Sequence, residues 1–155
     1  MKRFKLLHNV LLATVVSTCL LNIAHADDAL KMELTANQVI KNADGKTVYS
    51  PVRTAPAGTV IQYKANYANT INKDINDLMV TLPIPTNMTF TGEATPASAQ
   101  ASTDGKNYAD MPLMKKVDGK IVKVPYSEYR SLRWNIKLLP AKKTAVVAIN
   151  TTVDR

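Results

Sequence analysis

Alternating apolar and polar residues run through most of the chain from residue 30 onward. A period of two is typical of a β-strand that buries one face, so each run predicts a strand. The runs that share one face are Leu30, Met32 and Leu34; Ile61, Tyr63, Ala65 and Tyr67; Leu78, Val80 and Leu82; Leu132, Trp134, Ile136 and Leu138; and Ala145, Val147, Ile149 and Val153. No stretch has the period of an amphipathic helix, although residues 127–132 have room for one helical turn.

Turn residues separate these runs. Asp44-Gly45 predicts a hairpin between residues 39–40 and 48–49, and Asp118-Gly119 predicts another between residues 113–117 and 121–124. Residues 92–112 are rich in Ala, Ser, Thr and Pro and predict only short strands, near residues 100–103 and Tyr108. About seven strands with regular turns predict an all-β fold, an immunoglobulin-like antiparallel β-sandwich with Trp134 packed in its core.

The first 26 residues have a different pattern. Basic residues near the N-terminus precede an apolar run over residues 6–23, which ends in the small-x-small sequence Ala24-His25-Ala26. This order predicts a cleavable secretory signal peptide over residues 1–26, cut between Ala26 and Asp27. A permanent membrane anchor and a lipid-modified Cys19 are the two alternatives. Residues 27–155 are long enough for one domain and too few for two ordinary ones.

Cleavage at this site changes which chemistry the sequence offers. The formal net charge is +8 for the whole chain, whereas residues 27–155 hold 17 basic against 12 acidic residues, a net charge of +5. The only cysteine and both histidines precede the cut, so the mature chain has no disulfide, no Ser-His or Cys-His pair and no His or Cys zinc ligand. We therefore expect no enzyme and no cofactor, and the sequence nominates no catalytic, cofactor-binding or metal-binding residue.

Two acidic residues near Gly105 invite comparison with a calcium site. Asp104 and Asp110 are close in sequence, but Lys106 lies between them and the EF-hand spacing is absent. An ordinary turn is the better interpretation of this segment.

Several segments resemble the bacterial domain-of-unknown-function eleven family. Pro56–Tyr63 followed by Asn66–Thr70 is similar to its P-G-D-x-V-x-Y strand and T-N-T-G turn, and Leu78–Pro85 and Leu132–Lys143 are similar to its later strands. The similarity covers about residues 56–153. Departures lie in turns, at Ala57, Thr59, Asn72-Lys73 and Lys142. The resemblance implies an exported immunoglobulin-like domain and carries no catalytic residues with it.

Export and composition together predict a non-catalytic binding or structural module, periplasmic or extracellular. Its partner, an envelope or surface protein or polymer, is not specified by the sequence, and neither is the oligomeric state. The candidate contact region is Asp104–Tyr129, which contains the Asp118-Gly119 hairpin, Lys115, Lys116, Lys120 and Lys123, and the tyrosines Tyr126 and Tyr129. Loops raised on a rigid sandwich are where such domains make contacts.

The lysines of this hairpin have two other interpretations. They can protect exposed strand edges from aggregation, or they can contact anionic envelope polymers or lipid headgroups. A nucleic-acid partner is not expected, because no recognition module is present. The competing functional classes are an envelope hydrolase that uses only Asp, Glu, Ser and Lys, and a fibre-associated subunit or chaperone that works by strand exchange.

Overall fold

The structure, a computed structural model, describes residues 29–155. The predicted signal peptide, Cys19, both histidines and the cleavage site lie outside the described residues. The described part contains eleven strands and one short 3-10 helix. The elements are β1 (Leu30–Lys41), β2 (Thr47–Pro51), β3 (Val60–Asn69), β4 (Ile75–Pro83), β5 (Met88–Thr95), β6 (Gln100–Ser102), β7 (Ala109–Asp110), β8 (Met114–Val117), β9 (Lys120–Lys123), η1 (Tyr126–Glu128), β10 (Ser131–Leu139) and β11 (Thr144–Val153).

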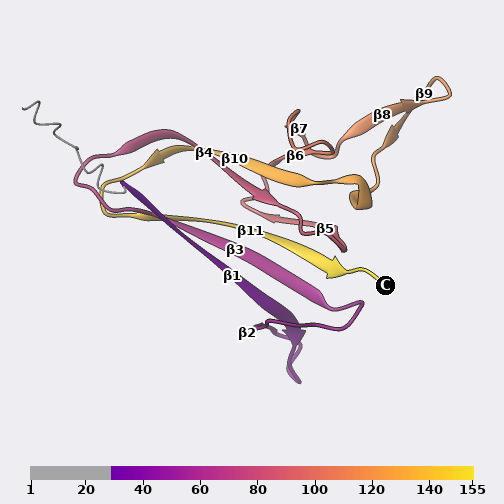
Figure 1. Ribbon diagram of the computed structural model, residues 1–155, viewed down its shortest axis with the longest axis horizontal. Coiled ribbons are helices and arrows are strands. Elements are labelled where there is room, and N and C mark those ends of the chain that lie inside the picture. The colour runs from indigo at the N-terminus through magenta and orange to yellow at the C-terminus, as the bar shows by residue number, and fades with distance from the viewer. Residues whose placement is uncertain (1–28) are drawn as a thin grey trace, which may run out of the picture.

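Two antiparallel sheets face each other (Figure 1). One has five strands in the order β2-β1-β3-β11-β5, and the other has four in the order β4-β10-β6-β7. The predicted all-β sandwich is therefore confirmed, as are both hairpins. The strands outnumber the seven or so expected because the segments between β5 and η1 contribute four short ones.

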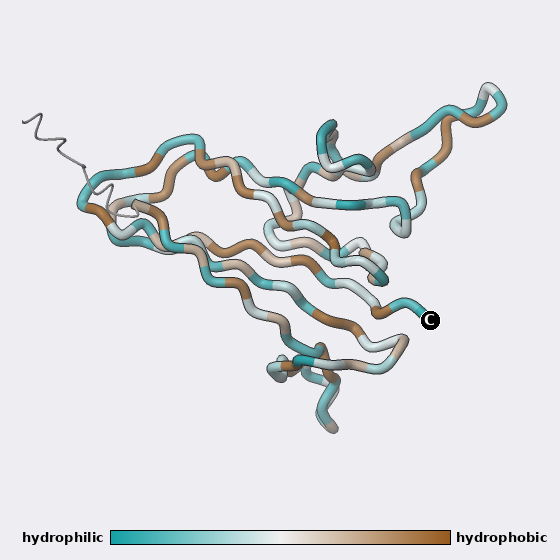
Figure 2. The backbone as a smooth tube through the Cα atoms, in the orientation of Figure 1, coloured by the Kyte–Doolittle hydropathy of each residue, from teal (hydrophilic) through white to brown (hydrophobic). Residues whose placement is uncertain are grey.

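The core lies between the two sheets, where apolar residues from the inner faces meet. Ala65 and Tyr67 of β3 are buried beside Val147 and Ile149 of β11, as their alternation predicts. Trp134 is 3% exposed, which confirms its predicted place in the core, and its indole N–H donates to the carbonyl of Pro96 at 2.8 Å. Figure 2 shows brown, apolar positions recurring along the inner strands.

One prediction about β10 is wrong. The alternation predicts Leu138 on the same face as Trp134, but Leu138 is 51% exposed, and the next residue, Leu139, is buried instead. The neighbouring strand β4 carries Asp77 in the left-handed region, with φ of 49°. The inward positions change parity on both strands there, from the pair Ile136 and Leu78 to the pair Leu139 and Ile75. A local break in the pleat explains the exchange of faces.

The sequence pattern does not predict β5, because Gly92 and small residues interrupt its apolar alternation, and the strand also contains a bulge. Its register with β11 shifts between Ile149 and Thr151. Gly92 lies in this interval with φ of +94°, a conformation that favours glycine. Across the bulge, Phe90 pairs with Thr151 and Ala94 pairs with Ile149, and both of these β11 residues are buried.

The five-stranded sheet extends beyond the sheet that covers it. Met32 and Leu34 of β1 pair with Tyr67 and Ala65 of β3, so they lie on the core-facing side of the sheet. Nevertheless both side chains are half-exposed. The covering sheet ends at β4, whose second edge pairs with no described strand. An apolar strip therefore remains open beside a free strand edge.

Candidate functional site

The β8–β9 hairpin is the most prominent feature of the candidate region. It forms a separate two-stranded sheet that projects from the sandwich (Figure 1). Its cross-strand pairs are Met114 with Lys123, Lys115 with Val122, Lys116 with Ile121, and Val117 with Lys120. Each pair joins one lysine to one apolar residue. Because paired residues share a face, both faces of the hairpin carry lysines and apolar side chains together.

The hairpin side chains are largely open to solvent. Ile121 is 73% exposed, the largest exposed fraction among the large apolar residues in the described part of the chain. Met114, Val117 and Val122 are also exposed. The apolar side chains of this hairpin therefore do not contribute to the core, and exposed apolar groups make it a candidate contact surface.

Two hydrogen bonds fix the base of the hairpin: the first attaches it to the sandwich, and the second joins the two ends of the hairpin to each other. The N–H of Leu113 donates to the hydroxyl of Tyr129 at 2.8 Å, and the N–H of Val124 donates to the carbonyl of Leu113 at 2.8 Å. Tyr129 is fully buried, and burial raises the pKa of its hydroxyl. A neutral, buried phenol thus holds Leu113, the residue before β8, in place.

An ion pair adds a second attachment. The ammonium of Lys115 lies 2.6 Å from a carboxylate oxygen of Glu128 in η1, and both side chains are part-exposed. Such a pair contributes little to stability, but it directs β8 toward η1. It also occupies one of the four hairpin lysines, whereas Lys116, Lys120 and Lys123 form no ion pair with the described residues.

Phe90 of β5 packs against two tyrosines at η1, Tyr126 within it and Tyr129 directly after it. Phe90 packs edge-on against Tyr126 with ring centroids 5.3 Å apart and stacks on Tyr129 at 5.8 Å. Tyr126 lies directly over Gly92, where an added Cβ would be 2.7 Å from the Tyr126 ring. The bulge in β5 therefore makes room for Tyr126, which stays 41% exposed. Of the two tyrosines that the sequence nominated, only Tyr126 is accessible to a partner.

The segment before the hairpin is a self-contained turn. The carboxylate of Asp104 accepts hydrogen bonds from the N–H groups of Asn107 and Lys106, each at 2.8 Å, and from the hydroxyl of Ser102. The Asn107 N–H first, and then that of Lys106, hold the pKa of Asp104 well below its usual range. These bonds agree with the turn interpretation. The carboxylate of Asp110 accepts from the side-chain amide of Gln100 at 3.1 Å.

Arg133 packs beside this turn. Its guanidinium lies 4.2 Å from the centre of the Tyr108 ring and donates to Gln100 at 2.7 Å. The Tyr108 hydroxyl is 2.6 Å from that of Ser131 on β10. A cleft of about 280 Å³ separates the turn from the hairpin, with Tyr108 and Asn107 on one side and Lys115 and Glu128 on the other. The turn is thus fixed to the sandwich at its own base.

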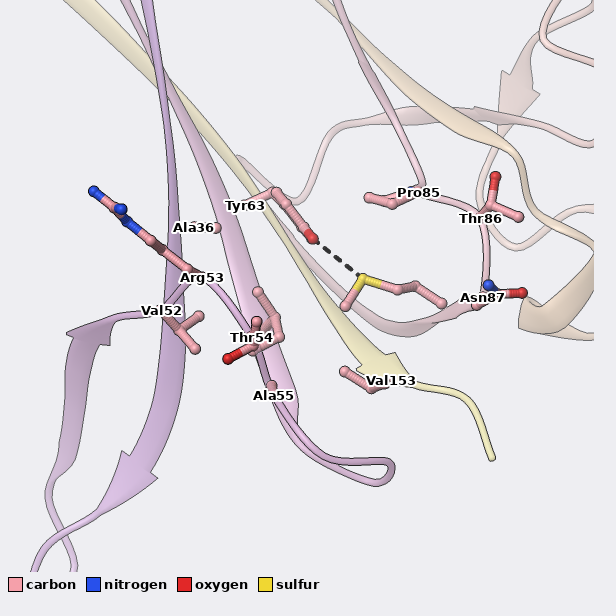
Figure 3. Close-up of a pocket in the computed structure, with 12 residues that line it drawn as sticks. Ala36, Val52, Arg53, Thr54, Ala55, Tyr63, Pro85, Thr86, Asn87 and Val153 are labelled. Atoms are coloured by element: carbon pink, nitrogen blue, oxygen red, sulfur yellow. Dashed lines mark hydrogen bonds between the residues drawn. The ribbon is translucent and has the colours of Figure 1, made fainter.

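A second cavity, of about 240 Å³, lies away from the hairpin (Figure 3). It is bordered by the segment between β2 and β3 and by the turn between β4 and β5. Arg53 is the single charged residue of its lining, and its side chain extends away from the other labelled residues. The Tyr63 hydroxyl lies 3.3 Å from the sulfur of Met88. The cavity offers apolar contact and hydroxyl groups to a small ligand.

Residues 29–155 contain no group of three or more His, Cys, Asp or Glu side chains placed to hold a metal ion. Within the same residues, no helix has the length and apolar character required to cross a membrane. Comparisons with protein-family models, with curated proteins and with solved structures find no match to the chain.

Proposed function

We propose that the chain is a non-catalytic binding module of the cell envelope, exported to the periplasm or beyond, and that the β8–β9 hairpin is its contact surface. One observation carries the proposal: Ile121 and its apolar neighbours are exposed on a projecting hairpin whose base is fixed to the core through Tyr129. A rigid base lowers the entropy that the hairpin loses on binding. The resemblance to the domain-of-unknown-function eleven family supports export and stays a prediction.

The test compares captured partners with and without the hairpin. Residues 114–123 are replaced by a short Gly-containing turn, while Leu113 and Val124 are kept because their hydrogen bonds hold the base. Each version of residues 27–155 is incubated with an envelope extract from the host. We expect the native chain to capture a component that the shortened chain loses, with both versions equally folded.

Single positions give a finer test. Lys116→Gln, Lys120→Gln and Lys123→Gln together remove three charges from the hairpin. The matched control removes three lysine charges at exposed positions in other turns: Lys46→Gln, Lys73→Gln and Lys143→Gln. Equal capture by both triple variants and by the shortened chain would contradict the contact role. Turnover of a peptidoglycan, ester or phosphate substrate by the native chain would contradict the non-catalytic role.

The open strip of β1 favours one second candidate, a fibre-associated subunit that accepts an extended strand from another protein. Such a strand would pair with the free edge of β4 and cover Met32 and Leu34 with alternate apolar side chains. Leu34→Asp separates the two candidates, because it is expected to block strand acceptance and to leave hairpin-dependent capture unchanged. Assembly of the native chain into envelope fibres, abolished by this substitution, would support the second candidate.

A further inference from the structure

We infer that the ligand of the β8–β9 hairpin is the surface of an anionic lipid bilayer. The inference rests on the proposed function, since it names the partner of the same surface. It follows from the combination of charge, exposed apolar side chains and projection that the hairpin presents.

The charge of the hairpin is strongly one-sided. Residues 114–123 contain four lysines and a single acid, Asp118. Glu128 pairs with Lys115, so three lysines remain for an external anion. Basic residues close to a negatively charged leaflet are attracted to it over roughly a Debye length, about 10 Å at 0.1 M salt. The hairpin is therefore suited to an anionic partner.

The apolar residues decide which anionic partner fits. An acidic polysaccharide or a polyphosphate offers charge but little apolar surface, so it would leave Ile121 and Met114 in water. At a bilayer surface, apolar side chains enter the boundary between headgroups and acyl chains while lysines extend their ammonium groups to the phosphates. Each face of the hairpin has both residue types, with Met114 and Ile121 on one face and Val117 and Val122 on the other.

The position of the hairpin allows this contact. β8 and β9 extend away from both sheets, so the hairpin reaches a flat surface before the body of the sandwich does (Figure 1). Tyr126 lies near its base, beside Pro112, Pro125 and Lys123, around a shallow cavity. Tyrosine is enriched at membrane–water interfaces because its ring is apolar and its hydroxyl is polar. We therefore expect Tyr126 to lie at the membrane–water interface when the hairpin is bound, with the sandwich outside the bilayer.

Vesicle flotation with residues 27–155 tests the inference. The probes are vesicles of phosphatidylglycerol and phosphatidylcholine in equal parts, and vesicles of phosphatidylcholine alone. We expect binding to the anionic vesicles only, and weakening when salt is raised from 0.1 to about 0.5 M. The triple variant Lys116→Gln, Lys120→Gln, Lys123→Gln is expected to bind roughly 100-fold more weakly, since each lysine near the surface contributes about 1 kcal/mol.

Two further variants separate lipid from a soluble polyanion. Ile121→Ser is expected to weaken vesicle binding several-fold, whereas the control triple variant at Lys46, Lys73 and Lys143 is expected to stay within about twofold of the native chain. Soluble polyphosphate is used as a competitor. If it binds as tightly as the vesicles do, and Ile121→Ser changes neither affinity, the ligand is a polyanion and the lipid inference is wrong.

The failure of this inference is distinguishable from failure of the proposed function. Suppose that the native chain does not bind anionic vesicles, but that the chain with the shortened hairpin fails to capture an envelope component that the native chain captures. The lipid assignment is then wrong, and the hairpin remains the contact surface. If the shortened chain and the native chain behave alike in both assays, the hairpin is not a contact surface and both proposals are wrong.

Discussion

The hydroxyl of Tyr129 accepts a hydrogen bond of 2.8 Å from the backbone N–H of Leu113, and this bond joins the projecting hairpin to the core. Tyr129 itself stacks on Phe90, which is buried on β5. A hairpin that makes few contacts of its own is thus held by a side chain of the sandwich. An isolated two-stranded sheet is marginal in water, so this attachment keeps the hairpin in one orientation.

The first prediction removes this bond. Tyr129→Phe keeps the ring and leaves the Leu113 N–H without its acceptor, which is expected to cost about 1–2 kcal/mol of the free energy of unfolding. Amide hydrogen exchange at Leu113 and Val124 is expected to quicken. The control is Tyr126→Phe, whose hydroxyl makes no hydrogen bond with the described residues, and its cost is expected to be near zero. If the two substitutions change the free energy of unfolding and the amide exchange rates equally, Tyr129 does not anchor the hairpin.

The second prediction concerns the space that the β5 bulge leaves for Tyr126. Gly92→Ala places a Cβ 2.7 Å from the Tyr126 ring and also forces alanine to adopt a positive φ. Gly45→Ala is the matched control, because Gly45 also has a positive φ but nothing within 4 Å of the added Cβ. We expect the positive φ to make each substitution lower the free energy of unfolding by about 1 kcal/mol. Gly92→Ala is expected to lower it further, because its Cβ clashes with the Tyr126 ring. Chemical denaturation measures the difference, and identical midpoints would show that Tyr126 moves freely.

The third prediction tests the exchange of faces on β10. Leu132→Ala removes a fully buried side chain and is expected to cost about 2–5 kcal/mol. Leu138→Ala changes the same residue type on the same strand, at a half-exposed position, and is expected to cost less than about 1 kcal/mol. The original strand pattern would instead give similar values, so equilibrium unfolding of the two variants decides between the two arrangements.

The fourth prediction follows from the lowered pKa of Asp104. Because its folded-state pKa lies below the ordinary value of about 3.9, ionised Asp104 stabilises the fold above that pH. This stabilisation is lost as pH falls toward the folded-state pKa. Asp104→Asn is therefore expected to melt at a lower temperature than the native chain at pH 6, and the gap is expected to narrow below about pH 4. Asp44→Asn, in the other turn, provides the control. A gap that is independent of pH would contradict the role of the charge.

The sequence predicts local features well because the signals for them are local. Asp44-Gly45 and Asp118-Gly119 form hairpin turns as expected, and the strand alternation around Trp134 places that residue in the core. The reversal at Leu138 was not predictable in this way. It depends on Asp77, which lies on a different strand some 60 residues earlier and adopts a left-handed conformation there.

In the candidate site, too, local features were predictable from the sequence and features that depend on distant residues were not. Exposure of the Asp118 hairpin was expected from its lysines and its turn. Burial of Tyr129 was not, because charged residues flank it in sequence, and it is buried only through the way η1 turns it over Phe90. Alternation of Met88, Phe90 and Ala94 was the one available signal for β5. Gly92 has no side chain to continue it, and the small residues that follow are typical of a loop.

The most direct test of the central claim, that the hairpin is the contact surface, is site-specific photo-cross-linking in intact cells. A photoreactive residue is placed at Ile121, and at Asp44 in the opposite β1–β2 turn as a control. The account predicts an adduct with an envelope lipid or protein from position 121 that is absent from position 44. An adduct from position 44 alone, or the same adducts from both positions, would contradict it.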